Sequence, residues 1–361
     1  MSFFIHEGVS LTVLSVAFWL AVVSRESVGG AEQILLQIDE GLVRRGHQSL
    51  VIARPESKIS GSLIPTVAID GGISNQAWCI AHDAIRRAIT DTLRRHPVDI
   101  VHLHGVDFAD YLPAIDVPVL VTLHLPLHWY KPSAFQVTRP NTFFHCVSRS
   151  QREDFPKNLA MLPEIENGVS ADLLRERVIH KRAFAAALGR ICPEKGFHLA
   201  LRSCRAANTP MLLAGKVFPF GEHQAYFAEQ IFAELDSQRQ YIGPVGMRGK
   251  RRLLSSAQCL VVPSLAPETS SLVAREALAC GTPVVAFAKG ALPEVVNHGE
   301  TGFLVQHADQ MPDAIRACGL LDPERCRQVA RQRFSPERMV ENYIATYRGI
   351  LEGSCRLPQA A

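Results

Sequence analysis

The sequence predicts an α/β fold with two doubly wound domains, each built on a parallel sheet. Short apolar runs alternate with helical patterns along most of the chain. Most of these runs are apolar at every position, as expected for strands that are covered on both faces. The chain also has 361 residues, more than one hydrophobic core usually organises.

The first half shows this alternation from its first apolar run. Ile34, Ile38 and Leu42 recur at helical spacing, and Gly46 follows as a stop signal. Strands are expected at residues 11–17, 49–53, 99–104, 117–124 and 142–148, with helices at 31–46 and 76–96. The expected first domain covers residues 1–160.

The second half repeats the scheme after a seam at about residues 155–184. Strands are expected at residues 185–191, 210–214, 240–242, 259–263, 283–286 and 302–305, with helices at 196–207, 222–235, 247–256, 272–279, 292–297 and 310–320. The expected second domain covers residues 161–335. An amphipathic helix carrying Met339, Tyr343 and Tyr347 is expected to follow, within residues 336–353.

Composition limits the class of function. With 38 basic and 35 acidic residues, the net charge of +3 is too small to indicate nucleic-acid binding. The nine cysteines are scattered without a CxxC pair, so neither a disulfide framework nor a zinc site is expected. The same pattern predicts a cytoplasmic location. The apolar run 11–23 is shorter than the roughly 20 residues of a membrane span. It is therefore interpreted as a buried strand that runs into a loop.

The strongest motif is Pro267-Glu-Thr-Ser-Ser-Leu-Val-Ala-Arg-Glu-Ala-Leu-Ala-Cys-Gly-Thr-Pro283, in which seven residues separate two glutamates. Glu268 lies in the loop after a strand, and Glu276 lies on the helix that follows. Carboxylates accept hydrogen bonds from sugar hydroxyls, and the helix N-terminus between them favours an anion. This arrangement fits a nucleotide-sugar; the alternative is a capped helix with an exposed Glu276.

A second motif, Leu188-Gly-Arg-Ile-Cys-Pro-Glu-Lys-Gly196, also follows a strand and opens a helix. Arg190 and Lys195 have the charge needed to neutralise a diphosphate and to stabilise a leaving phosphate oxygen. The alternative is that both are ordinary surface charges. In doubly wound domains ligands bind at the carboxyl ends of the strands, so the two motifs are expected to converge.

Together these stretches resemble the retaining GT-B glycosyltransferases of family 4. The glutamate pair, the Arg and Lys pair, the turn Glu166-Asn-Gly-Val169 and the loop Val28-Gly-Gly-Ala-Glu32 are all similar to family motifs. So are Gly290-Ala-Leu-Pro-Glu-Val-Val296 and Gly299-Glu-Thr-Gly-Phe-Leu-Val305. The resemblance spans nearly the whole chain and implies two Rossmann-like domains facing across a cleft, with the last helix crossing back to the first domain.

The resemblance also implies a role for each matching residue. Glu276 would hold the ribose of the donor, Glu268 the donor sugar, and Arg190 and Lys195 the diphosphate. The remaining residues implied in donor binding are Gly29, Gly30, Thr269, Ser270, Ser271 and Leu272. His124 would be the catalytic histidine near the donor sugar, with His128 as a less favoured choice.

The implied activity is metal-independent transfer of a glycosyl group, hexosyltransferase-like, with retention of anomeric configuration. The donor would bind the second domain, and a glycan, lipid or small-molecule acceptor would bind the first. The alternatives are another sugar-nucleotide enzyme of epimerase or phosphorylase type, and a non-catalytic carbohydrate- or nucleotide-binding protein. Ser270-Ser271 replaces the Phe-Gly pair that is common in the family, which leaves the donor sugar open. The basic helix within 76–96 is interpreted as a solvated face, with weak peripheral contact to a membrane as the alternative.

Overall fold

The computed structural model describes residues 9–68, 74–156, 161–174 and 180–354. Cys355 and parts of the expected seam lie outside these ranges. The chain forms two compact units. Unit 1 comprises Met1–Cys146, Asp154–Ile165 and Val340–Ala361, and unit 2 comprises Val147–Glu153 and Glu166–Met339. The chain therefore passes from unit 1 to unit 2, back to unit 1 and again to unit 2 between residues 146 and 166. The sequence predicted a single boundary at residue 160.

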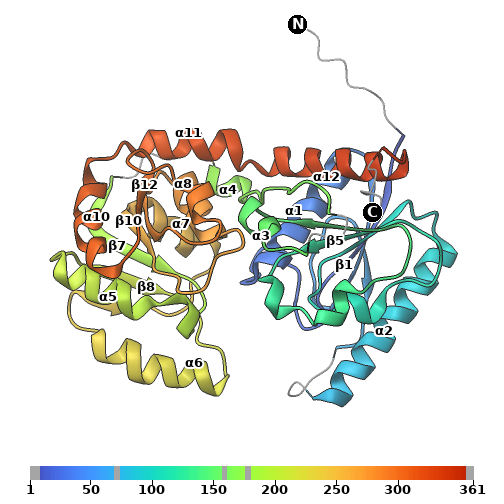
Figure 1. Cartoon of the computed structure of the whole chain (residues 1–361), viewed down its shortest axis with the longest axis horizontal. Helices are drawn as coiled ribbons and strands as arrows, with labels where there is room; N and C mark the ends of the chain where they lie inside the picture. Colours follow the sequence, from blue (N-terminus) through green and yellow to red (C-terminus); the bar gives the residue numbers. More distant parts are fainter. Residues whose placement is uncertain (1–8, 69–73, 157–160, 175–179, 355–361) are drawn as a thin grey trace, which may run out of the picture. The chain divides into compact units, whose positions relative to one another are not determined.

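Unit 1 is built on a six-stranded parallel sheet of order β3-β2-β1-β4-β5-β6. Figure 1 labels two of its strands, β1 and β5. Its strands are β1 (Thr12–Val16), β2 (Gln48–Ala53), β3 (Ser62–Pro65), β4 (Ile100–Leu103), β5 (Val119–Leu123) and β6 (Thr142–Cys146). Its long helices are α1 (Gly30–Arg44) and α2 (Asn75–Arg95), and most of α12 (Pro336–Leu351) also belongs to it.

Unit 2 has a second six-stranded parallel sheet, of order β12-β11-β10-β7-β8-β9. Its strands are β7 (Arg182–Leu188), β8 (Met211–Ala214), β9 (Arg239–Tyr241), β10 (Ala257–Val262), β11 (Val284–Phe287) and β12 (Gly302–Val305). Its helices are α3 (Arg149–Glu153), α4 (Ala171–Leu174), α5 (Phe197–Ala206), α6 (Gly221–Tyr226), α7 (Met247–Ser256), α8 (Leu272–Ala279), α9 (Leu292–Val295), α10 (Met311–Ala317) and α11 (Pro323–Arg333).

The strands of unit 2 supply alternate residues to two cores, one on each face of the sheet. Leu260 and Val262 pack with residues of α7, α8 and α11, whereas Cys259 and Val261 pack with residues of α5 and α10. Since successive side chains of a strand point to opposite faces, helices cover both sides of the sheet. The two parallel sheets, together with the helices on both faces of the sheet in unit 2, confirm the predicted doubly wound α/β class.

Several details of the predicted elements were wrong, among them the short helices α3 and α4, which were not predicted. The edge strand β3 was not predicted, because its four residues are partly exposed and end in a proline. Helix α11 was also missed, since it buries only a narrow stripe of Cys326, Val329 and Ala330. The helix expected over 222–235 is divided into α6, a π-helical turn at Phe227–Ile231 and a 3₁₀ turn at Phe232–Glu234.

The apolar run 11–23 forms β1 and the loop after it, as predicted. Trp19 and Val23 of this loop are both buried in unit 1. Among the described residues, no helix is both long enough and apolar enough to cross a membrane.

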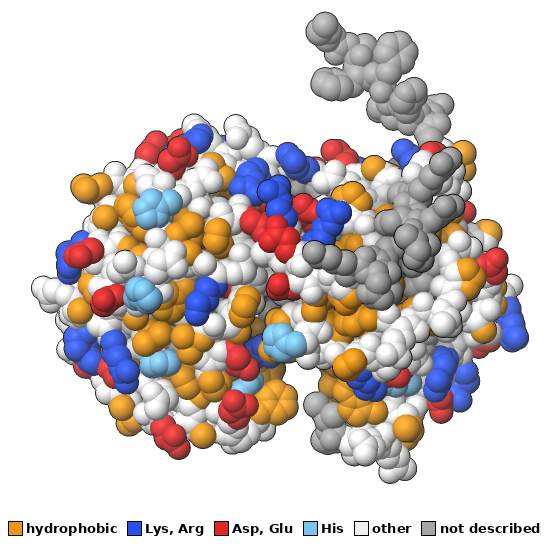
Figure 2. Space-filling model, viewed as in Figure 1, with side chains coloured by type: hydrophobic (Ala, Val, Ile, Leu, Met, Phe, Trp, Pro, Cys, Tyr) orange, Lys and Arg blue, Asp and Glu red, His pale blue; other side chains and the backbone are white. Residues whose placement is uncertain are grey.

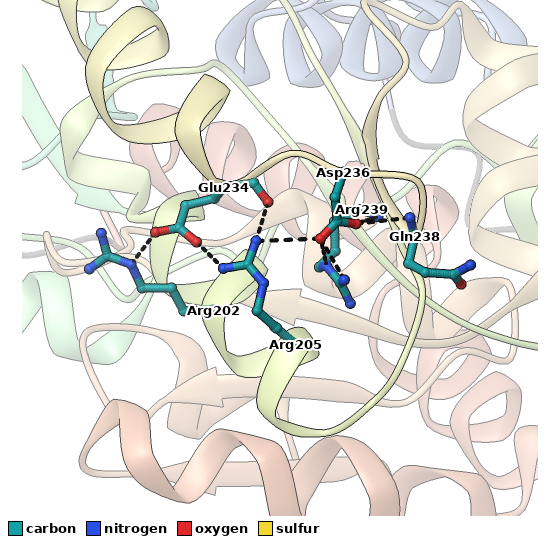
Figure 3. Close-up of polar contacts among 6 residues, drawn as sticks. All are labelled: Arg202, Arg205, Glu234, Asp236, Gln238 and Arg239. Atoms are coloured by element: carbon teal, nitrogen blue, oxygen red, sulfur yellow. Dashed lines mark hydrogen bonds and ion pairs between the residues drawn. The ribbon is translucent and has the colours of Figure 1, made fainter.

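Ion pairs hold the polar edge of unit 2, where β9 ends the sheet (Figure 3). Glu234 pairs with Arg202 and Arg205 of α5, and Asp236 pairs with Arg205 and with Arg239 of β9. The network therefore joins α5 to the segment that leads into the edge strand. Because several of these groups are well exposed to solvent, we expect the network to set local geometry more than overall stability.

Candidate functional site

Two loops of unit 2 meet where the strand order reverses. Strands β7 and β10 are neighbours in the sheet, and the chain leaves them toward opposite sides. Ligands of doubly wound folds bind at this switch point, beyond the carboxyl ends of the strands. The loop after β7 carries Arg190 and Lys195, and the loop after β10 carries Glu268. Both predicted motifs therefore lie at the position where the fold favours binding.

Lys195 and Glu268 are in direct contact. The Lys195 Nζ lies 2.7 Å from the Glu268 Oε1, and the side chains are 28% and 11% exposed. The same carboxylate oxygen accepts a hydrogen bond from the Ser264 hydroxyl. The pair is partly open to solvent, so it is positioned by the fold and still accessible to a ligand.

Close backbone contacts explain why these loops meet. Gly196 adopts a φ of +62°, and a Cβ there would lie 2.3 Å from the Pro263 oxygen. The carbonyl of Glu194 accepts a hydrogen bond from the Leu265 amide, at 2.8 Å. Glycine is needed at residue 196 both for the left-handed conformation and for the approach of the second loop.

The Gly290 motif supports the backbone of Glu268. Gly290 has a φ of +56°, and a Cβ there would lie 2.4 Å from the main-chain carbonyl oxygen of Glu268. That oxygen accepts a hydrogen bond from the Ala291 amide, at 2.8 Å. The glutamate is thus held through its main chain as well as its side chain.

Glu276 is buried, which excludes the alternative of an exposed side chain on a capped helix. Its Oε1 lies 2.6 Å from the Nζ of Lys250 on α7. Sequence analysis missed Lys250, although it precedes the buried Leu253 and Leu254 by three and four residues and so shares their face of the helix. The second glutamate therefore also has a lysine partner.

Helix α8 begins in the predicted place, directly after the loop that carries Glu268. Ser271 stands before the first turn with a φ of +51° and has no side-chain cap bond. Ser270 is buried, and its hydroxyl accepts a hydrogen bond from the Asn167 side chain at 3.0 Å. Thr269 and Leu272, on either side of the serine pair, are half-buried. The amides at this end are thus held in place by the Glu166-Asn-Gly-Val169 turn.

Arg275 explains how this turn is fixed, although sequence analysis assigned no role to this residue. The side chain is fully buried, stacks on the ring of Phe334 and donates to the carbonyls of Ser270 and Asn167. Its guanidinium also lies 3.6 Å from the Glu166 carboxylate. Burial lowers the pKa of Arg275 to about 10, which still leaves it charged at neutral pH. The signal for such a residue is an arginine, next to Glu276, in the middle of the mainly apolar helix α8.

Replacing Arg275 with methionine should destabilise unit 2 by about 3 kcal/mol, because two buried carbonyls would lose their donor and the Glu166 carboxylate would keep only Arg333. Chemical denaturation followed by far-UV circular dichroism measures this change. All three tryptophans, Trp19, Trp78 and Trp129, belong to unit 1, so tryptophan fluorescence should not follow it. The control is Arg325→Met, which removes an exposed ion pair. Equal stability of the two variants would contradict a structural role for Arg275.

The glycine pair predicted to approach the donor belongs to unit 1. Gly29 is the residue before α1, and Gly30 is its first residue. A Cβ on Gly29 would lie 1.9 Å from the Glu32 carboxylate, which folds back over the start of the helix. Burial raises the pKa of Glu32 above its ordinary value. The motif therefore packs a carboxyl group against the helix N-terminus.

His124 directly follows β5 and lies in a cluster of buried histidines. Its Nε2 is 3.0 Å from the Nδ1 of His104, and it is 9% exposed. Burial lowers the pKa of His124 to about 3, so it is neutral at physiological pH. The less favoured His128 lies in a 3₁₀ turn, Leu127–Trp129.

A second part of this cluster forms a directional chain of hydrogen bonds. The His145 Nδ1–H donates to the Cys146 carbonyl, so its Nε2 accepts from the Thr122 hydroxyl. The Thr122 oxygen then accepts from the His102 Nε2–H, and the His102 Nδ1 accepts from the Tyr347 hydroxyl. With these directions both histidines are neutral, and each of their ring nitrogens has a partner.

Two family models match the chain. A model described as Glycosyltransferase Family 4 matches residues 28–173, and one described as Glycosyl transferases group 1 matches residues 172–333. Among curated relatives, the phosphatidyl-myo-inositol mannosyltransferase of Mycobacterium leprae is 26% identical over 339 residues, covering 84% of this chain and 87% of the relative. The D-inositol 3-phosphate glycosyltransferase of Mycobacterium bovis is 33% identical over 215 residues, covering 52% of this chain and 44% of the relative.

Solved structures share the fold. The sucrose-phosphate synthase of Thermosynechococcus elongatus superposes with a TM-score of 0.76 at 19% identity, covering 95% of this chain and 100% of that chain. Anabaena HepE, solved in complex with UDP and glucose, superposes with a TM-score of 0.70 at 18% identity, covering 94% and 99%. The predicted GT-B architecture is therefore confirmed.

Proposed function

The chain is a GT-B glycosyltransferase of family 4, group 1, and on that premise we propose that it transfers a glycosyl group from a nucleotide-sugar to an acceptor, with retention of anomeric configuration. The donor binds unit 2, at the carboxyl ends of β7 and β10. The acceptor binds unit 1.

The observation that carries this proposal is the meeting of the two charged loops in unit 2. Lys195 and Glu268 come from loops that flank the switch point and touch at 2.7 Å. Glu276 lies on the helix that starts after the second loop, next to Lys250. Two carboxylates that accept from hydroxyl groups, with cations and helix amides nearby, match a ligand made of ribose, diphosphate and sugar.

The chemistry proposed for this site depends on electrostatic stabilisation. Arg190, Lys195 and the amides of residues 269–272 bind the diphosphate and stabilise the charge that develops as the glycosidic oxygen leaves. Glu268 is already engaged by Lys195 and Ser264, which favours a role in holding sugar hydroxyls over that of a nucleophile. We therefore propose front-face transfer, in which the leaving diphosphate helps to remove the acceptor proton. No divalent metal ion takes part in this chemistry.

The acceptor is proposed to be a glycan, a lipid or a small molecule, and nucleic acid is not proposed. On the face shown in Figure 2, acidic and basic side chains are interspersed, and neither sign forms a continuous area. A backbone of phosphates would favour one basic surface. We place the reaction in the cytoplasm, since none of the described cysteines forms a disulfide, which fits a reducing compartment.

Replacing both Arg190 and Lys195 with alanine should weaken nucleotide-sugar binding by about tenfold or more for each residue, because each loses a hydrogen bond to a charged group. A thermal-shift screen with UDP-, GDP- and ADP-sugars first identifies the donor, and titration then measures its affinity. Arg190→Ala alone is informative because it leaves the contact between Lys195 and Glu268 intact.

The matched control removes two exposed basic residues of the same unit, with Arg316→Ala and Arg325→Ala combined. It should bind the donor like the unchanged protein. Unchanged affinity in the Arg190 and Lys195 double variant would disprove this diphosphate site. The anomeric configuration of the product, measured by NMR, tests retention separately. An inverted product would contradict front-face transfer but would not contradict the proposed donor site.

A further inference from the structure

Three side chains of unit 2 that have no part in the proposed reaction lie close together at the loop after β7. They are Cys192 and Glu194 of that loop and His223 of α6. One donor atom from each residue lies within 4.8 Å of the others. These donors are separated by up to 31 residues in sequence, so only the fold brings them together.

Two of the three groups, Glu194 and His223, have a buried polar atom without a hydrogen-bond partner. Cys192 is fully buried, and His223 is 8% exposed. The His223 Nδ1 and the Glu194 Oε2 are buried atoms that have no hydrogen-bond partner. Buried polar atoms are normally satisfied, and an unsatisfied imidazole nitrogen facing a carboxylate and a thiol is typical of a site that takes up a cation.

We propose that Cys192, Glu194 and His223 form a binding site for a divalent transition-metal ion, Zn²⁺ above all, which joins the loop after β7 to α6. Thiolate, imidazole and carboxylate are the three kinds of ligand that zinc takes in proteins. With Cys192 ionised, Cys192 and Glu194 together carry two negative charges, which balance the charge of the ion.

The geometry requires only a small adjustment. Ligands at zinc–donor lengths of 2.0–2.3 Å in a tetrahedral arrangement lie about 3.3–3.6 Å apart. The three donors are within 4.8 Å, so rotations of the side chains close the difference. Phe218 and Phe220 pack edge-on against the His223 ring and limit its position.

Binding must release a proton. Burial, together with a hydrogen bond to Glu194, raises the pKa of the Cys192 thiol to about 11. Although burial opposes it, the hydrogen bond from Cys192 and nearby positive charges hold the pKa of Glu194 below its ordinary value. At neutral pH the site therefore holds a thiol and a carboxylate, and the ion replaces the thiol proton, which passes to solvent.

The test is a titration of the full, tag-free chain, first treated with a chelator and kept reduced, with Zn²⁺ in competition with a zinc dye. We expect one ion per chain, bound with the release of the thiol proton. Co²⁺ in place of Zn²⁺ should show a thiolate-to-metal charge-transfer band. Zn²⁺ should also raise the unfolding temperature seen by circular dichroism but not by tryptophan fluorescence.

Cys192→Ser and His223→Phe should each weaken binding by about a hundredfold or more, since even partners of metal ligands contribute ten- to a hundredfold. Cys204→Ala, which removes another buried thiol, and His307→Gln, which removes an exposed histidine, should bind like the unchanged chain. Equal loss in all four variants or a Co²⁺ complex without the thiolate band would each overturn the proposal. If a site variant fails to fold, the Co²⁺ spectrum of the unchanged chain decides.

Discussion

Replacing Glu268 with glutamine should reduce the rate of glycosyl transfer by about a hundredfold or more and leave the protein folded. The carboxylate holds the Lys195 ammonium at 2.7 Å and is proposed to accept hydrogen bonds from the donor sugar. Removing one preorganised group from such a site typically costs this much in kcat. Glutamine keeps the shape of the side chain, so packing should be preserved. Initial rates at saturating donor measure the effect.

The control for this variant is Glu229→Gln, which neutralises an exposed carboxylate of the same unit. Circular dichroism and the donor-induced thermal shift check that Glu268→Gln still folds. A rate within threefold of the unchanged enzyme would show that the charge of Glu268 is not needed, and the proposed role of the ion pair would then be wrong.

Unit 1 should lose stability steeply in mild acid. Burial holds the pKa values of His102 and His104 well below 6.5, lowers that of His145 to about 4, and lowers that of His124 to about 3. The unfolded chain binds these protons below pH 6.5, whereas the folded chain does not until the pH approaches the lowered values. Stability is therefore fully present above pH 6.5 and falls from there toward pH 4, by up to about 1.4 kcal/mol per pH unit for each histidine.

The hydrogen-bond chain gives this loss a specific cause. Protonation of His102 at Nδ1 removes the acceptor for the Tyr347 hydroxyl, and protonation of His145 at Nε2 removes the acceptor for Thr122. Denaturant midpoints measured between pH 7.5 and pH 4.5 by tryptophan fluorescence report unit 1, because all three tryptophans lie there.

A variant series separates the buried histidines from general acid effects. His145→Gln should flatten the pH dependence, since glutamine accepts from Thr122 without titrating. His96→Gln, which removes an exposed histidine of the same unit, should leave the slope unchanged. Midpoints that stay constant from pH 7.5 to pH 5, or equal slopes in the two variants, would show that the buried histidines do not control acid stability.

Much of the fold could be predicted because its strands are buried on both faces. Continuous apolar runs located β1, β2 and β12 closely, and helical periodicity gave the bounds of α7 and α8. The strand expected over 185–191 ends at Leu188, so residues 189–191 already belong to the loop that carries Arg190 and Lys195. Apolarity alone does not reveal where pairing stops, because Ile191 is as fully buried as the central strand residues Ala185 to Ala187.

The candidate site was only partly predictable, for a similar reason. Loop residues that follow strands can be located from sequence, which is how Arg190, Lys195 and Glu268 were found. Their supports come from elsewhere in the chain: Lys250 reaches Glu276 across 26 residues, and Arg275 reaches the Asn167 carbonyl across 108. Contacts at such separations depend on topology, and one sequence does not encode them as a local pattern.

The place of Tyr347 in the chain has a consequence for biosynthesis. Its hydroxyl donates a hydrogen bond to His102 of β4, which lies 245 positions earlier in the sequence. Val340, in the same helix, fills the space beside Gly41 of α1. A ribosome must therefore reach residue 347 before unit 1 has all of these contacts. Until then, part of the interior of unit 1 stays uncovered, whereas all residues of unit 2 have already been synthesised.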